Sequence, residues 1–222
     1  MQVSAEIRWF WAEQPPHLVT WFCDSDNFPC PAGGGSRLRT DIYLRDVSQT
    51  ELGLKLRDKN KEDDSGVEVK GLVEVRGNSL AEGPFSGGIE IWTKWTSASL
   101  TRRSLQAGLS GTVKTDKLRW LRKFDTTGPE LEEVKLNAEE KPTEGRKLPA
   151  RGCNVELTKV TVEGVGTCWT FGFEAFDALR TVEDDLRKVA AFLAKRLPDG
   201  VAMGALASYP AWLQRYTATD RD

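Results

Sequence analysis

The segment LGLKLRDKNKEDDSGVEVKG, residues 52–71, decides the fold that the sequence predicts. Aliphatic and charged residues alternate strictly over 54–57 and again over 67–70. Alternation with a period of two predicts strands that are apolar on one face and polar on the other. The polar faces of these strands form either an ordinary solvent-exposed sheet surface or a site that binds an anion. Their polar positions are mainly cationic: Lys55, Arg57 and Lys70.

The composition is that of a globular protein with no general affinity for polyanions. Of the 222 residues, 39% are hydrophobic and 29% charged, which suits one domain spanning 1–222 with a buried core. The formal net charge is −2, so nucleic-acid binding is not expected, and any anion must be attracted by a local concentration of Lys and Arg. No apolar run is long enough for a membrane span, and the N-terminus carries early charge. We therefore expect a cytoplasmic protein without a membrane partner.

The cysteines and the single histidine do not suggest a zinc site or a nucleophilic triad. Cys23 and Cys30 are too widely spaced for a zinc knuckle, and His17 follows two prolines in a loop-like stretch. We interpret the four cysteines as structural thiols. The redox state of Cys23 and Cys30 stays open.

Strand patterns outnumber helix patterns along the chain. Helices are predicted at 97–108 and 181–198, and the polar stretches 14–36 and 127–150 are expected to be irregular excursions. So few helices cannot cover both faces of a large sheet, which predicts an α+β domain built on an antiparallel sandwich or closed barrel of about eight strands. The strands are predicted at 3–11, 37–46, 51–58, 66–75, 87–97, 112–126, 153–160 and 167–176.

The last two predicted strands form a hairpin whose register can be tested against their alternation. A three-residue loop at 163–165, with Gly164 in a left-handed conformation, keeps the polar residues of both strands on one side. It pairs Glu156 with Gly172 and Asn154 with Glu174. Glu156 and Glu174 would then lie near one another, where they could hold a divalent metal or simply face water.

The order of these segments resembles the CYTH domain, also called the triphosphate tunnel metalloenzyme fold, over nearly the whole chain. The opening strand of that family usually reads Glu-x-Glu-x-Lys, and EIRWF (6–10) stands in its place. The 153–176 hairpin resembles the acidic hairpin of the family, and SYPAWL (208–213) its closing tail. Further segments similar to its second strand, its Arg-x-Arg strand, its Lys-Gly strand and its later basic strand are RTDIYL (39–44), LGLKLR (52–57), VEVKG (67–71) and LRWLRKF (118–124).

The resemblance implies a closed antiparallel barrel, with helices packed outside it that include a C-terminal helix. It implies a lumen that cradles a small phosphorylated anion, such as triphosphate or a nucleotide, together with Mg²⁺ or Mn²⁺. Arg8 is expected either to pair with Glu6 or Glu174 or to contact phosphate. The implied metal ligands are Glu6, Glu156 and Glu174, and the implied phosphate-binding residues are Lys55, Arg57, Lys70 and, with the register left open, Arg119, Arg122 and Lys123.

Three positions depart from the family pattern and leave two functions open. Arg8 replaces the second glutamate of the opening motif, Phe10 replaces its lysine, and Gly172 occupies one of the acidic positions of the hairpin. Losing a hard oxygen ligand and adding a cation both weaken the binding of a divalent metal. The protein is therefore either a metal-dependent hydrolase of triphosphate or an organic triphosphate, or a non-catalytic relative that binds a polyanion or serves as structure.

Tryptophans in the early and central strands are the remaining candidates for a binding role. They could stack on a base, but large rings at alternating strand positions are more often part of a core. We expect the core role for these four residues: Trp9, Trp11, Trp92 and Trp95.

Overall fold

The fold is described from a computed structural model of the chain. Arg57 and nearly all of the helix predicted at 97–108 lie outside the described residues. The described residues are 2–23, 37–44, 50–56, 66–97, 112–137, 139–143, 145–177 and 180–217.

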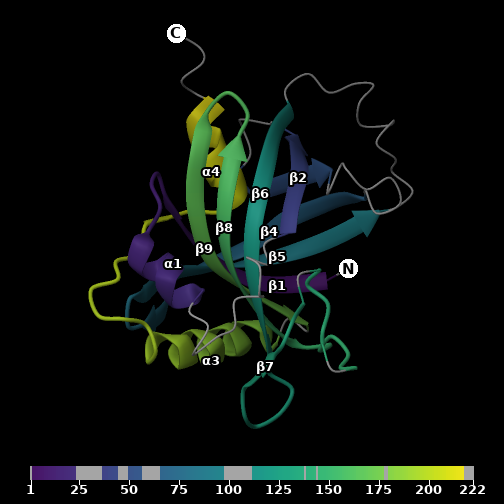
Figure 1. Ribbon diagram of the computed structural model, residues 1–222. Helices are drawn as coiled ribbons and strands as arrows, with labels where there is room; N and C mark the ends of the chain where they lie inside the picture. The colour runs from purple at the N-terminus through teal and green to yellow at the C-terminus, as the bar shows by residue number, and fades with distance from the viewer. Residues whose placement is uncertain are drawn as a thin grey trace.

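Eight antiparallel strands close into a barrel, which confirms the predicted α+β fold class (Figure 1). Around the barrel the order is β1-β5-β4-β3-β2-β6-β8-β9, and β9 returns to pair with β1. Two short strands lie off this ring: β7 (Glu132–Val134) pairs with β6, and β10 (Ala205–Leu206) pairs with β1. The eight barrel strands are β1 (Gln2–Trp11), β2 (Arg37–Leu44), β3 (Leu52–Leu56), β4 (Val67–Glu82), β5 (Phe85–Ser97), β6 (Thr112–Asp125), β8 (Gly152–Val162) and β9 (Gly166–Asp177).

The β8–β9 hairpin has the predicted register. Glu156 lies opposite Gly172, and Asn154 lies opposite Glu174. Gly164 in the connecting turn has a φ of 77°, the left-handed conformation that the odd loop requires. Because neighbours across two antiparallel strands point the same way, Glu156 and Glu174 both face the inside of the barrel.

The larger hydrophobic cluster lies outside the barrel, and a smaller one, which includes Phe10, Tyr43 and Val160, lies at one end of its interior. In β1, Ala5, Ile7 and Trp9 are buried against this outer core, whereas Glu6 and Arg8 point inward. Two helices cover this part of the outer surface: α1 (Pro16–Phe22), inside the excursion predicted at 14–36, and α3 (Val182–Ala194) (Figure 1). The alternation read from the sequence therefore separates an apolar outer face from a charged inner face.

The helix α3 begins and packs largely as its sequence predicts. Its first turn carries three acidic residues, which suit the positive end of a helix dipole. Asp185 is buried and accepts hydrogen bonds from Arg151 at 2.7 Å, which ties the helix to the start of β8. Thr181 occupies the N-cap position, where its side chain makes no capping hydrogen bond and its backbone carbonyl accepts from the N–H of Asp185 at 2.9 Å.

The C-terminal helix α4 (Tyr209–Thr217) closes one end of the barrel instead of packing only on its outside. The Trp212 ring stacks on Phe10, with ring centroids 4.8 Å apart, and Phe10 belongs to the inward face of β1. Tyr209 stacks on the inward-facing Tyr43 at 6.1 Å. Phe10, which stands where the Glu-x-Glu-x-Lys motif has its lysine, thus provides an apolar contact for the helix that closes this end of the barrel.

The remaining predictions concern the excursion at 127–150, the tryptophans and membrane-spanning segments. The excursion 127–150 contains β7 and a single bridge between Leu136 and Pro142. Trp9 is buried in the outer core, as expected, whereas Trp92 is buried but lines a pocket, and Trp95 is 44% exposed. Within the described ranges, no helix is long and apolar enough to cross a membrane.

Replacing Phe171 by alanine tests whether the outer core stabilises the barrel. The Phe171 ring is fully buried and packs on Trp9, Phe22 and Phe85. We expect the free energy of unfolding, measured by urea denaturation, to fall by about 3–5 kcal/mol. The control Val73→Ala, at a 56% exposed position, should change it by less than about 0.5 kcal/mol. Equal losses in both variants would contradict this location of the core.

Candidate functional site

The candidate site is a pocket inside the barrel, lined by strands from around the ring and by Tyr209 of α4. Four carboxylates line it: Glu6, Glu68, Glu156 and Glu174. Seven cations line it: Arg8, Arg39, Lys55, Lys70, Lys94, Lys117 and Arg119.

Cations exceed carboxylates in this cavity although the whole chain is slightly acidic. A further carboxylate, Asp41, is fully buried behind the lining and accepts from Arg39 at 2.9 Å. Even with Asp41 counted, the lining keeps a positive excess. In an enclosed space of low dielectric constant, such an excess attracts an anion more strongly than it would at a surface.

Two glutamates and two lysines form one ion-paired group across β1, β9, β4 and β5. Glu6 lies opposite Glu174 in the register of β1 and β9. The Lys70 ammonium lies 2.5 Å from Glu6 and 3.7 Å from Glu174, and Lys94 donates to Glu174 at 2.7 Å. Burial raises the pKa of Glu174, but Lys94 and Lys70 outweigh it and hold that pKa well below its usual range. Glu174 is therefore an ionised carboxylate with cationic partners.

Glu156 is held between two arginines. Arg8 donates to it at 2.9 Å and Arg119 at 2.7 Å. Burial acts to raise the pKa of Glu156, and the two guanidinium groups lower it below its usual range.

Arg8 and Gly172 are two halves of one packing arrangement. A Cβ atom on Gly172 would lie 3.2 Å from both Cβ and Cγ of Arg8 and 2.8 Å from the carbonyl oxygen of Ile7. The absent side chain therefore gives the Arg8 side chain the room it needs to reach Glu156. The side chain of Arg8 on β1 thus crosses the space beside Gly172 on β9 to reach Glu156 on β8.

A third group surrounds Lys117 near the α4 end. The Lys117 ammonium donates to the Tyr43 hydroxyl at 2.6 Å and lies 3.9 Å from the centroid of the Tyr209 ring. Burial lowers the pKa of Lys117 and raises that of Tyr43 to about 12. On the adjoining strands, Lys55 pairs with Glu68 at 2.9 Å.

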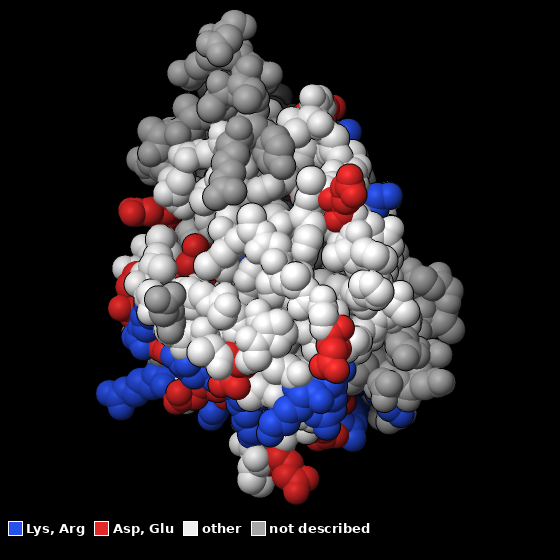
Figure 2. All heavy atoms as spheres, turned by 90° about the vertical axis from the view of Figure 1, so that its left-hand side faces the viewer, with Lys and Arg blue, Asp and Glu red and all other residues white. Residues whose placement is uncertain are grey.

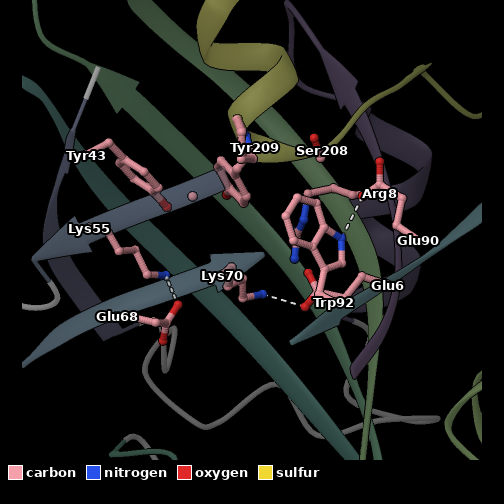
Figure 3. A pocket seen from close by; sticks show the side chains of 12 residues that line it. Glu6, Arg8, Tyr43, Lys55, Glu68, Lys70, Glu90, Trp92, Ser208 and Tyr209 are labelled. Atoms are coloured by element: carbon pink, nitrogen blue, oxygen red, sulfur yellow. Dashed lines mark hydrogen bonds and ion pairs between the residues drawn. The ribbon is translucent and has the colours of Figure 1, made fainter. Parts of the chain in front are cut away.

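A second, more apolar pocket adjoins the charged cavity and shares part of its lining (Figure 3). Trp92, Tyr43 and Tyr209 surround it, and the indole of Trp92 donates to Glu90 at 3.0 Å. Burial raises the pKa of Glu90 to about 7, and the nearby Glu6 charge adds to this effect. Glu90 is therefore partly protonated near neutral pH.

Seven of the ten residues predicted from the sequence line the charged cavity. They are Glu6, Arg8, Lys55, Lys70, Arg119, Glu156 and Glu174.

The remaining three predicted residues lie elsewhere. Arg57 is outside the described residues. Arg122 lies on the opposite face of β6, where it donates to Glu133 at 2.6 Å and covers the Phe22 ring of α1, so it is removed from the phosphate-binding set. Lys123 shares the inward face of β6 with Arg119 and contacts Asn154 there, but it is not among the residues that line the cavity. Parity is the reason for the correction at Arg122 alone, because Arg119 and Arg122 are three positions apart on one strand and face opposite sides.

The sequence prediction missed six strand residues of the cavity that the same alternation identifies. Each lies an even number of positions from another inward-facing residue of its strand, and extending the period of two along every strand would have found them all. They are Arg39 and Tyr43 on β2, Glu68 on β4, Lys94 on β5, Lys117 on β6 and Thr158 on β8.

The carboxylates of the cavity do not form a site for Mg²⁺ or Mn²⁺. Glu6 and Glu174 are paired with lysines, and Glu156 with two arginines. Across the part of the chain that the structure describes, no group of three or more His, Cys, Asp or Glu residues could hold a metal ion. Both oxygens of Glu156 are taken by arginines, and one oxygen each of Glu6 and Glu174 is taken by lysines, so the donor set does not fit either ion and we derive no chemical step through a metal.

The cationic character of the cavity is not displayed on the face shown in Figure 2. On that face Lys and Arg gather with Asp and Glu along the lower edge, at the height of α3 in Figure 1, and the middle is largely uncharged. Mixed charges of this kind are typical of a solvated surface. This face therefore shows no concentration of positive charge without carboxylates beside it.

Comparisons with known proteins do not identify the chain. No family model and no curated protein matches it. Among solved structures, a Pyrococcus horikoshii protein is 12% identical, with a TM-score of 0.47 over 96% of this chain and 99% of that one. A conserved hypothetical protein from Pyrococcus furiosus is 12% identical (TM-score 0.38, 87% and 90% covered), and the triphosphatase of the mimivirus capping enzyme is 10% identical (TM-score 0.43, 86% and 88% covered). Similarity this low leaves the function to be argued from the residues of the chain itself.

Replacing Gly172 by alanine tests the packing of Arg8. The added Cβ atom would press on Arg8 and on the Ile7 carbonyl, so we expect the free energy of unfolding to fall by about 1–3 kcal/mol. The matched control is Gly77→Ala, where the new Cβ meets no atom within 4 Å. Denaturation midpoints of the two variants provide the measurement, and a Gly172→Ala protein as stable as the Gly77→Ala protein would refute the arrangement.

Replacing Glu90 by glutamine tests the charge balance of the adjoining pocket. In the folded protein Glu90 keeps its proton up to about pH 7, whereas in the unfolded chain it releases the proton near 4.5, the ordinary pKa of a glutamate. The contribution of Glu90 to stability therefore falls as the pH rises through this window. We expect the melting temperature of Glu90→Gln to exceed that of the wild type increasingly from pH 5 to pH 8. Glu163→Gln, at a 70% exposed side chain, is the control and should show no such trend.

Proposed function

We propose that this protein binds a small phosphorylated anion, such as triphosphate or a nucleotide, inside its barrel. One observation carries the proposal: seven cations line a single cavity, and they outnumber the six carboxylates that line it or pair with its cations once Asp41 and Glu140 are counted. The chain as a whole has no positive charge to explain this concentration. A phosphate chain supplies several negative charges in a narrow shape, which suits a tunnel lined by cations from many strands.

The ion pairs of the cavity hold its cations in position for such a ligand. Lys70 and Lys94 are held in position by Glu6 and Glu174, and burial has already removed most of their water. A phosphate group that enters replaces or shares these carboxylate partners and gains hydrogen bonds from charged donors. Such bonds are about twice as strong as neutral ones.

The resemblance to the CYTH domain supports the same proposal, and we infer a divergent relative of that family. The charged inner faces of β1, β3, β4, β6, β8 and β9 correspond to the motifs that carry the resemblance. The family resemblance also implies hydrolysis with Mg²⁺ or Mn²⁺. The cation-paired state of Glu6, Glu156 and Glu174 argues instead for a protein that binds the anion without cleaving it.

Titration calorimetry with sodium tripolyphosphate tests the binding proposal. We expect the wild type to bind and Lys70→Gln to bind at least about tenfold more weakly, because one charged hydrogen-bond donor is lost. Lys188→Gln is the matched control: it removes the same charge from α3, where Lys188 contacts the backbone carbonyls of Gly128 and Pro129 outside the barrel. Equal affinities in the two variants, or no binding by the wild type, would refute the proposal.

An assay of phosphate release decides between binding and hydrolysis. Tripolyphosphate is incubated with the wild type in the presence of Mg²⁺ or Mn²⁺, and with Glu174→Gln. Binding without release is the outcome that we expect. Release by the wild type that disappears in Glu174→Gln would instead establish a metal-dependent triphosphatase.

A further inference from the structure

Glu140 belongs to the excursion between β7 and β8, yet its carboxylate reaches an arginine of the cavity. Its Oε1 accepts a hydrogen bond from Nε of Arg119 at 2.8 Å, and its Oε2 accepts one from NH2 of the same guanidinium. The remaining nitrogen, NH1, donates to Glu156 at 2.7 Å. The Glu140 side chain is only 11% exposed, so this contact is shielded from water. The excursion thus supplies a carboxylate to a cation of the binding cavity.

The contact uses the edge of Arg119 that suits a phosphate best. Nε and NH2 are parallel donors that bind a carboxylate or a phosphate in a bidentate manner. Glu140 occupies this edge, while Glu156 holds the guanidinium from its other side. An anion can therefore take the Nε and NH2 donors only when Glu140 leaves, and Arg119 keeps one carboxylate partner when that happens.

The backbone of the turn shows that Glu140 is held in an unfavourable conformation. Its φ is 61°, in the left-handed region that residues other than glycine rarely adopt. Asn137 fixes the turn by accepting hydrogen bonds from the backbone N–H groups of Glu139 and Lys141, both at 3.0 Å, and from that of Glu140 at 2.9 Å. The flanking side chains of Glu139 and Lys141 are 69% and 71% exposed. The turn can therefore move away without disturbing the outer core.

We propose that the Glu140 carboxylate takes the place of a bound anion: it accepts hydrogen bonds from the Arg119 guanidinium until a phosphorylated ligand displaces it. This inference rests on the proposed function and adds the residue that sets its affinity and selectivity. The binding free energy of a ligand must offset the loss of the contact between Glu140 and Arg119. Anions that reach Arg119 with a full negative charge are therefore favoured over weakly charged ones. By linkage, the ligand weakens the turn contact by the same factor by which the turn weakens the ligand.

Titration calorimetry with tripolyphosphate on two Glu140 variants provides the test. Glu140→Gln removes the charge, and Glu140→Gly removes the side chain while suiting the left-handed backbone. We expect each variant to bind at least about fivefold more tightly than the wild type. Glu132→Gln is the matched control, since it removes the same charge from an exposed ion pair with Arg146 on the same excursion, and its affinity should equal that of the wild type.

Amide hydrogen exchange distinguishes displacement of Glu140 from a merely structural role, in which the ligand would leave the exchange rates of the turn unchanged. In the wild type, tripolyphosphate should accelerate the exchange of the amides of residues 139–141, because the turn is released. Melting curves of all variants establish that they are folded. Wild-type affinity in both folded Glu140 variants, with unchanged exchange in the turn, would overturn the inference and leave the proposed function intact. Absence of tripolyphosphate binding in the wild type and in every variant would overturn both.

Discussion

Closure of the barrel is the constraint on which the rest of the structure depends. Once β9 pairs with β1, every second residue of eight strands must share one small interior volume. Several of these residues are charged, and a buried charge is costly unless it is paired. The observed pairs, Lys70 with Glu6, Lys94 with Glu174, and Arg8 and Arg119 with Glu156, satisfy this requirement. The cations in excess of these carboxylates are the basis of the proposed binding of an anion.

The same constraint explains the contacts of Arg8 and Phe10 on the inner face of β1. The absence of a side chain at Gly172 lets Arg8 reach Glu156. Phe10 meets Trp212 and packs against α4 at the end of the barrel. Both inward-facing side chains are therefore satisfied by contacts within the protein.

Much of the fold and part of the site could be predicted from the sequence because the signals are local. Alternation located the inward faces that carry Lys55, Lys70 and Glu6, and Gly164 in a three-residue loop set the β8–β9 register. Arg122 was assigned to the site because the register of its strand had been left open, although parity with Arg119 excludes it. The contact of Glu140 with Arg119 could not be predicted, since it depends on a turn far from the motif strands and on a left-handed residue other than glycine.

A crystal structure grown with tripolyphosphate is the most direct test of the central claim, that the interior of the barrel is an anion site. The account predicts phosphate groups inside the barrel, within hydrogen-bond distance of Lys70, Lys94 and Arg119. An interior whose ion pairs are unchanged at saturating tripolyphosphate, with phosphate only on the outer surface, would contradict it.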